Sequence, residues 1–270
     1  MQMRSLLPFA LAALPAFSQQ PSEVPWGLNL PTAQGLEQGS MDLRFTHRFA
    51  DQVRDNSKDA FGLDGYAYAA FGFEKNFVSW PGLTFQAYRT ADQKTITLAF
   101  HQKLILDPTF QVALRVERFD ETVRDNPVTV GYQEGKLGTA IQLPLEWRAS
   151  ENLVLTAVPT WLSRSNLKRE SLLNVAWSGK YEFTPEQAFI AEYYPRPSKQ
   201  KHAMGITGNP LSKAGWAMGY MFKTRGHRFT ILGTNVPGTT SNQVLSGDWG
   251  GQGPRATKSW GLGFNIARMF

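Results

Sequence analysis

Apolar and polar side chains alternate with a period of two over most of the chain after residue 38, and helical periodicity is almost absent. Residues 109–117 show the pattern clearly, with apolar side chains at the even positions from Phe110 to Val116. Residues 173–183 repeat it. A period of two places successive side chains on opposite faces of a strand, so the chain is predicted to be all-β.

About twelve strands follow from this pattern, each close to the ~9–11 residues that a tilted membrane-spanning strand needs. The predicted strands cover residues 39–49, 63–74, 80–90, 94–105, 109–118, 136–147, 151–162, 172–183, 187–196, 214–223, 226–236 and 258–270. Apart from a short connection near 91–93, tight turns alternate with long polar connections along the chain. This order is typical of up-and-down outer-membrane barrels, with short periplasmic turns and longer external loops.

Aromatic residues indicate that the apolar faces contact lipid. Trp80 and Trp147 fall near the predicted periplasmic strand ends, and Trp161, Trp216 and Trp260 fall near the outer ends. Tryptophan gathers at both membrane boundaries because its ring is apolar and its N–H is polar. The apolar side chains are therefore predicted to face outward and the polar ones to face the lumen.

The C-terminal strand carries two further predictions. Residues 260–270 alternate and end in Phe270, with Phe264 and Ile266 on the same face, which resembles the signal by which barrel-assembly machinery recognises bacterial outer-membrane barrels. Because lipid offers no hydrogen-bond partners, the barrel must close. The strand at 39–49 is therefore predicted to pair with the strand at 258–270.

The first residues have the features of a cleaved export signal. Arg4 precedes a short apolar stretch over residues 5–17, and Ala16 and Ser18 fit the −3 and −1 positions of a cleavage site. Residues 1–18 are predicted to be a signal peptide, residues 19–38 a periplasmic tail or a short plug, and residues 39–270 the barrel. The bacterial outer membrane is the predicted location.

Composition excludes several classes of function. The formal net charge is +6, but basic residues are spread along the chain without a cluster, so no nucleic-acid partner is predicted. The chain has no cysteine, which excludes disulfides, thiolate metal sites and covalently attached haem. No stretch after residue 20 approaches the ~18 apolar residues of a spanning helix.

The strand positions opposite the apolar faces carry charges of both signs. The predicted lumen-lining residues are Arg44, Arg48, Asp64, Glu74, Lys103, Arg115, Glu117, Glu146, Lys180, Glu182, Glu192, Arg196, Lys223 and Arg228. A charge removed from water needs a partner, so these side chains are expected to pair and to narrow the lumen. We predict a narrow or partly occluded pore, with Arg48 paired to Asp64 or, alternatively, both lining water without contact.

Residue patterns for catalysis or metal binding are weak. The four histidines, His47, His101, His202 and His227, show no metal-ligand spacing, so no metal site and no cofactor are predicted. Some barrels of this size are phospholipases with a Ser–His pair on the outer wall. His101 has lumen parity, and its strand carries no serine on the same face, so the protein is predicted not to be an enzyme.

Four segments resemble a family of bacterial outer-membrane β-barrels classed as a domain of unknown function, family 5777. They are His47–Phe49, Phe61–Asp64, the stretch from Gly226–Phe229 to Thr234–Asn235, and Gly263–Phe270. The resemblance covers essentially the whole chain after the signal, although residues 119–213 carry no matching motif. It implies a barrel fold and an outer-membrane location, with no established activity.

Two functions remain open at this point, with a third less favoured. The first is a narrow pore or passive transport scaffold for small solutes. The second is a barrel that docks a periplasmic or surface protein, such as a lipoprotein or a cytochrome. A lipid-modifying enzyme is the third. In each case outer-membrane lipids and lipopolysaccharide are the expected surroundings of the wall.

Overall fold

The computed structural model describes residues 26–49, 53, 63, 67–77, 79–80, 82–91, 95–121, 136–163, 171–195, 214–236, 238–246 and 260–270. The predicted signal peptide, residues 19–25, Asp64 and Arg196 lie outside this set. Among the described residues, no helix is long and apolar enough to cross a membrane.

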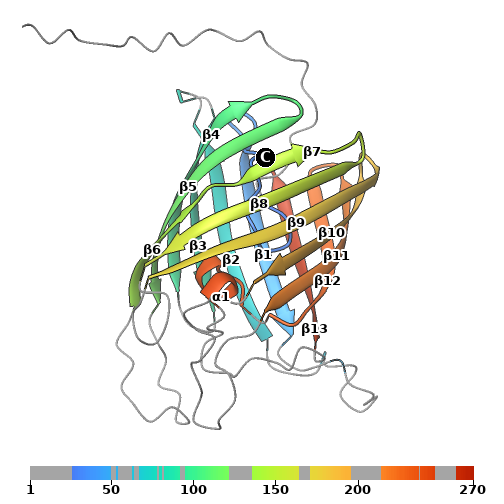
Figure 1. The fold of residues 1–270 in the computed structure, drawn as a ribbon. Coiled ribbons are helices and arrows are strands. Elements are labelled where there is room, and N and C mark those ends of the chain that lie inside the picture. The colour runs from blue at the N-terminus through green and yellow to red at the C-terminus, as the bar shows by residue number, and fades with distance from the viewer. Residues whose placement is uncertain are drawn as a thin grey trace, which may run out of the picture.

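Thirteen strands form one antiparallel sheet that closes on itself (Figure 1). The elements are β1 (Met41–Phe49), β2 (Ala67–Asn76), β3 (Leu83–Thr90), β4 (Ile96–Leu106), β5 (Phe110–Glu121), β6 (Lys136–Gln142), β7 (Leu145–Arg148), β8 (Leu153–Leu162), β9 (Leu172–Thr184), β10 (Gln187–Tyr194), β11 (Gly215–Thr224), β12 (His227–Thr234), α1 (Ser241–Ser246) and β13 (Gly261–Met269). The predicted up-and-down β-barrel is confirmed, and α1, which the pattern did not indicate, lies inside it (Figure 1).

The barrel closes between its first and last strands, as predicted. β1 pairs with β13 from Asp42 opposite Met269 to Arg48 opposite Gly263. The main chains of Met41 and Phe270 then exchange two hydrogen bonds of 3.0 and 2.8 Å. The side chains of Phe264 and Ile266 in β13, and of Phe270 just after it, lie on the outer face of the sheet. Their role in assembly stays a prediction.

Proline divides one predicted strand. Residues 136–147 were expected to be continuous, but Pro144 interrupts them, and β6 and β7 each pair with both β5 and β8. Opposite this break lies Pro159, whose carbonyl accepts a 2.9 Å bond from the Leu143 N–H. Proline has no N–H to donate to a ladder. The barrel thus has twelve positions around its circumference, one of them filled by two short strands.

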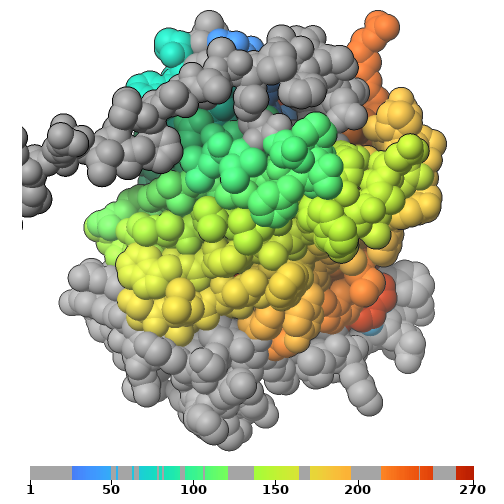
Figure 2. Space-filling view, turned by 45° about the horizontal axis from the view of Figure 1, so that its top comes forward, coloured from blue at the N-terminus to red at the C-terminus, as the bar shows by residue number. Residues whose placement is uncertain are grey.

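The burial pattern is inverted relative to a soluble barrel. Leu173, Trp177 and Phe183 on β9 are 76%, 52% and 56% exposed, whereas Arg115 and Glu117 on β5 are 1% and 2% exposed. Figure 2 shows the outer side of β5 to β11 as a continuous wall. Apolar side chains therefore cover the outside, where lipid offers the backbone no hydrogen-bond partner, and charged side chains occupy the interior.

Candidate functional site: the barrel lumen

Residues 26–36, named here the plug segment, lie inside the barrel. The segment runs into β1 at the turn end of the barrel, which is the end that carries the short connections. It starts with a tight turn, in which Gly27 N–H donates to Leu30 O at 2.8 Å and Trp26 forms a bridge with Pro31. Leu28 and Leu30 are 0% and 2% exposed and belong to the apolar core of the lumen.

One carboxylate of the wall holds this turn. Glu192 on β10 accepts hydrogen bonds from the main-chain N–H groups of Leu28 at 2.6 Å, Asn29 at 2.9 Å and Leu30 at 3.2 Å. Tyr194 also donates its hydroxyl to Glu192, and its oxygen accepts a 2.9 Å bond from Asn29 Nδ2. Bonds to a charged acceptor are stronger than neutral ones, so Glu192 is the main anchor of the turn.

Cationic and amide side chains on β1 and β13 hold the same turn. Arg44 Nη2 and Asn265 Nδ2 both donate to Leu28 O at 2.9 Å. Arg48 Nη2 donates to Asn29 Oδ1 at 2.8 Å. The turn is therefore clamped between an acidic side on β10 and a basic side on β1 and β13.

The second half of the plug segment has its own anchors. Glu146 on β7 accepts from Ala33 N–H at 3.3 Å and from Gln34 Nε2 at 2.6 Å. Asn76 Nδ2 donates to Leu36 O at 3.2 Å. Both halves of the segment thus exchange hydrogen bonds with charged or amide side chains of the wall.

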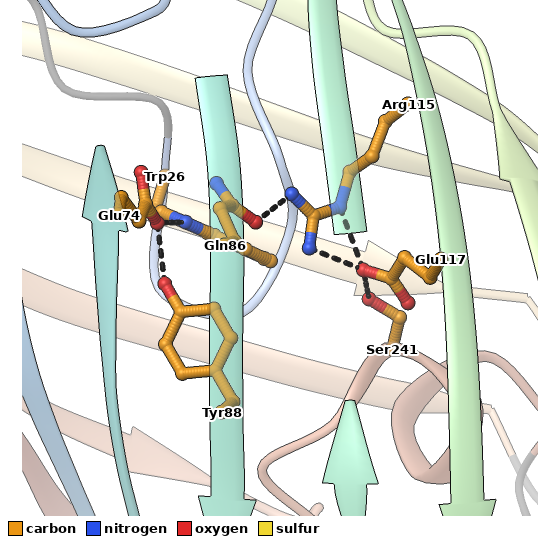
Figure 3. Close-up of polar contacts among 7 residues, drawn as sticks. All are labelled: Trp26, Glu74, Gln86, Tyr88, Arg115, Glu117 and Ser241. Carbon is orange, nitrogen blue, oxygen red and sulfur yellow. Dashed lines mark hydrogen bonds and ion pairs between the residues drawn. The ribbon is translucent and has the colours of Figure 1, made fainter. Parts of the chain in front are cut away.

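Trp26 lies between two guanidinium groups. The Arg44 and Arg115 carbons lie 4.6 and 4.5 Å from the ring centroid, within the range of a cation–π contact. The indole N–H donates to Glu74, which also accepts from the Tyr88 hydroxyl (Figure 3). The ring therefore ties the start of the plug segment to three strands.

Arg115 connects this region to a second occupant of the lumen. Its guanidinium contacts Glu117 Oε1 at 2.6 Å and donates to Gln86, and Glu117 Oε1 accepts a 2.9 Å bond from Ser241 Oγ (Figure 3). Ser241 begins α1, which belongs to the connection between β12 and β13 at the loop end of the barrel. One guanidinium thus contacts the plug segment directly and the α1 region through Glu117.

Residues 238–246, named here the α1 segment, are held differently. Thr240 Oγ1 accepts from Gln243 N–H at 3.2 Å, while Gln243 Oε1 accepts from Thr240 N–H at 3.2 Å, which is a capping box. Val244 and Leu245 are 2% and 1% exposed. Asn174 Nδ2 on β9 donates to Leu245 O at 2.7 Å. Local capping and apolar burial account for most of this attachment.

The structure places the predicted lumen residues on the inward parity of their strands, except Asp64 and Arg196, which lie outside the described residues. Seven of them contact or approach the plug segment, and an eighth, Glu117, binds Arg115. The eight are Arg44, Arg48, Glu74, Lys103, Arg115, Glu117, Glu146 and Glu192. Lys103 approaches the plug segment at Gly35. The pairing of Arg48 with Asp64 stays a prediction; the described partners of Arg48 are amide and carbonyl oxygens.

Lys180, Glu182, Lys223 and Arg228 lie nearer the turn end. Lys180 Nζ is 3.0 Å from Glu182, and Arg228 Nη2 is 3.5 Å from Asp42. Sequence reasoning missed Asp42, although it shares the parity of Arg44 and Arg48. It also missed Arg148, 3.7 Å from Glu182.

Small cavities lie beside the plug segment. A cavity beside Glu146 and Lys180, and another between Tyr88, Arg115 and Thr240, each offer about 30 Å³ to the centres of water molecules. A water needs ~10–15 Å³ by this measure, so each cavity has room for two or three. A third cavity, at the turn end between Leu36, Asp42 and Arg228, offers about 80 Å³ by the same measure.

The three described histidines lie apart from one another on β1, β4 and β12. His101 is 0% exposed and points into the lumen, while His47 stacks on Phe264 with ring centroids 4.9 Å apart. His227 stacks on Phe229. Among the described residues, no group of three or more metal-ligating side chains occurs.

Known structures share this architecture. An outer-membrane channel from Pseudomonas putida F1 aligns with a TM-score of 0.54 at 10% identity, covering 94% of this chain and all of that one. The KdgM porin aligns with a TM-score of 0.51 at 8% identity, covering 86% and 99%. At these identities the likeness shows the fold alone.

Sequence comparison identifies the family. A search of curated protein sequences gave no match. The model of the membrane-bound β-barrel domain DUF5777 matches residues 24–270, in agreement with the predicted outer-membrane location. The match covers the plug segment as well as every strand, so the chain belongs to the DUF5777 family of membrane-bound β-barrel domains.

Proposed function

We propose that the protein is an outer-membrane channel for small solutes, closed at rest by the plug segment. The observation that carries the proposal is the clamp around the turn at residues 27–30, in which Glu192 accepts three main-chain N–H groups while Arg44 and Arg48 donate from the other side. A twelve-position barrel lies between those filled by side chains and those that leave a channel. Its lumen needs an occupant to be closed.

The chemistry of the clamp favours an occupant that can leave. Charged side chains on the wall can exchange the plug segment for water, and such an exchange changes stability by ~1.5–3 kcal/mol for each hydrogen bond to a charged group. An apolar wall would instead resist hydration. Withdrawal of the segment would leave a hydrated passage lined by Arg44, Arg48, Arg115, Glu146 and Glu192.

Conductance of the full mature chain in planar bilayers tests the proposal. Wild-type protein is expected to show rare openings, and Glu192→Gln is expected to raise the open fraction about tenfold or more, because it removes the charge that accepts three bonds. Glu182→Gln is the matched control, since Glu182 pairs with Lys180 rather than with the plug segment. Equal silence of wild type and both variants would contradict the channel.

The same measurement addresses the docking alternative. A barrel that never conducts and co-purifies with a second polypeptide would be a scaffold for a lipoprotein or cytochrome. We assign the protein no catalytic role and no cofactor: a lipid-cleaving Ser–His pair must reach acyl chains, and His101 faces away from them. Lipid, lipopolysaccharide and the assembly machinery are its expected contacts on the outer wall and at the C-terminal strand.

A further inference from the structure

The lumen wall recognises main-chain atoms of the plug segment. Glu192 binds the N–H groups of three successive residues, and Leu28 O receives two donors, from Arg44 and Asn265. Further along, Glu146 binds Ala33 N–H and Asn76 binds Leu36 O. Acceptors on the wall thus meet amide N–H groups, and donors meet carbonyl oxygens, in the pattern that any peptide presents.

Side-chain recognition adds a preference at the first residues. The Trp26 ring fits between two guanidinium groups, and Leu28 and Leu30 pack into the apolar core of the lumen. Gly27 permits the close approach of the turn to the wall, because a Cβ at this position would overlap Glu192 Oε1. Glu192 could avoid the overlap only by moving away from the N–H groups of Leu28 and Leu30.

From these contacts we propose that the lumen is a binding site for short peptides, which the plug segment occupies as an internal ligand. The solutes that compete with it are peptides that form a tight turn, with an aromatic residue followed by a small residue and then apolar ones. The link between peptide binding and transport rests on the proposed function, because a competing peptide would enter a channel that the plug segment otherwise closes. Binding itself rests on the wall contacts alone.

The variant Gly27→Ala in the full chain separates the wall from its internal ligand, since it disturbs the plug segment and substitutes no wall side chain. The probe is a fluorescent peptide with the sequence of residues 26–30, Trp-Gly-Leu-Asn-Leu, blocked at both ends. Its matched control is Trp-Ala-Leu-Asn-Leu. Gly35→Ala is the control variant, because its Cβ would approach the flexible side chain of Lys103 at 2.9 Å and Thr84 Oγ1 at an ordinary contact distance of 3.7 Å.

Fluorescence anisotropy should show the glycine peptide binding Gly27→Ala about tenfold or more tightly than the alanine peptide, and Gly35→Ala and wild type binding it weakly. Addition of the glycine peptide should also reduce the conductance of Gly27→Ala. Equal binding of both peptides, binding of neither, or a plug segment that stays in place in Gly27→Ala would each overturn the inference.

The two proposals fail in different ways. Conductance of Gly27→Ala without peptide binding would leave the channel in place and remove the peptide site. Selective peptide binding by a barrel that never conducts would support the peptide site and remove the channel. The anisotropy measurement therefore does not depend on transport.

Discussion

The plug segment and the α1 segment occupy one lumen but are attached by different means. The plug segment has no regular secondary structure, and charged wall residues bind its main chain, with Glu192 alone accepting three N–H groups. The α1 segment satisfies part of its own backbone through the capping box of Thr240 and Gln243 and buries Val244 and Leu245. The plug segment depends on the wall for its conformation, whereas the α1 segment is stabilised partly by its own hydrogen bonds.

This difference suggests which occupant moves. Release of either segment exposes apolar side chains, Leu28 and Leu30 in one and Val244 and Leu245 in the other, at ~25 cal/mol for each Å². The plug segment differs in that it has no cap of its own, so loss of its wall partners alone leaves three of its main-chain N–H groups without hydrogen bonds. Arg115 contacts the plug segment at Trp26 and binds Glu117, which binds the α1 segment at Ser241, so the two attachments should not be independent.

Replacement of Arg115 should have the largest effect, because Arg115 contacts the plug segment and holds Glu117, the partner of the α1 segment. Arg115→Met leaves Glu117 buried without its ion-pair partner, and breaking a buried pair costs about 3 kcal/mol or more. We expect lower resistance to heat, measured by the temperature at which the folded band is lost on gels. Arg118→Met, at an exposed position on the same strand, is the control. Equal loss of heat resistance in both variants would rule out a special role for Arg115 in linking the plug segment to the α1 segment.

Ser241→Ala should have a smaller effect and sharpen the comparison. It removes one hydrogen bond to a carboxylate, about 1.5 kcal/mol, and leaves the Arg115–Glu117 pair intact. Limited proteolysis of the β12–β13 connection should accelerate by about tenfold, while the plug segment stays in place. A plug segment released to the same degree would mean that the two occupants form one unit.

Gln243→Ala should have the smallest effect, about 1 kcal/mol, because the bonds that Gln243 Oε1 accepts, from the N–H groups of Thr239 and Thr240, are both neutral. Proteolysis of the same connection is the measurement, with channel conductance recorded in parallel. We expect faster cleavage and unchanged conductance. Increased conductance would show that the α1 segment, and not the plug segment, closes the lumen.

The sequence predicted the wall of this barrel because a strand exposes its side chains with a period of two. Exposed Leu173 and buried Arg115 follow from parity once the apolar face is assigned to lipid. The pairing of β1 with β13 follows from the need to close the sheet. The break at Pro144 was also visible, since proline cannot donate to the ladder, but it was read as part of a continuous strand.

The occupants of the lumen were harder to predict. For residues 19–38 the sequence predicts either a tail or a plug, because the contacts of Leu28 and Asn29 are with residues far along the chain and leave no local pattern. Residue Asp42 could have been found by parity with Arg44. The helix α1 had a local signal, Thr240 followed three residues later by Gln243, which is a capping-box pattern. This signal lies within a long polar connection, where no helix was predicted.

Chemical access to the plug segment tests the central claim most directly. The chain has no cysteine, so a single cysteine can be labelled with a hydrophilic maleimide without background. Ala33, in the plug segment, is 0% exposed, and Glu37, just beyond it, is exposed. Ala33→Cys should react roughly 100-fold more slowly than Glu37→Cys if closure is favoured by about 3 kcal/mol, and adding Glu192→Gln should remove most of this difference. Equal rates at the two positions in otherwise wild-type protein would contradict a lumen closed by the plug segment.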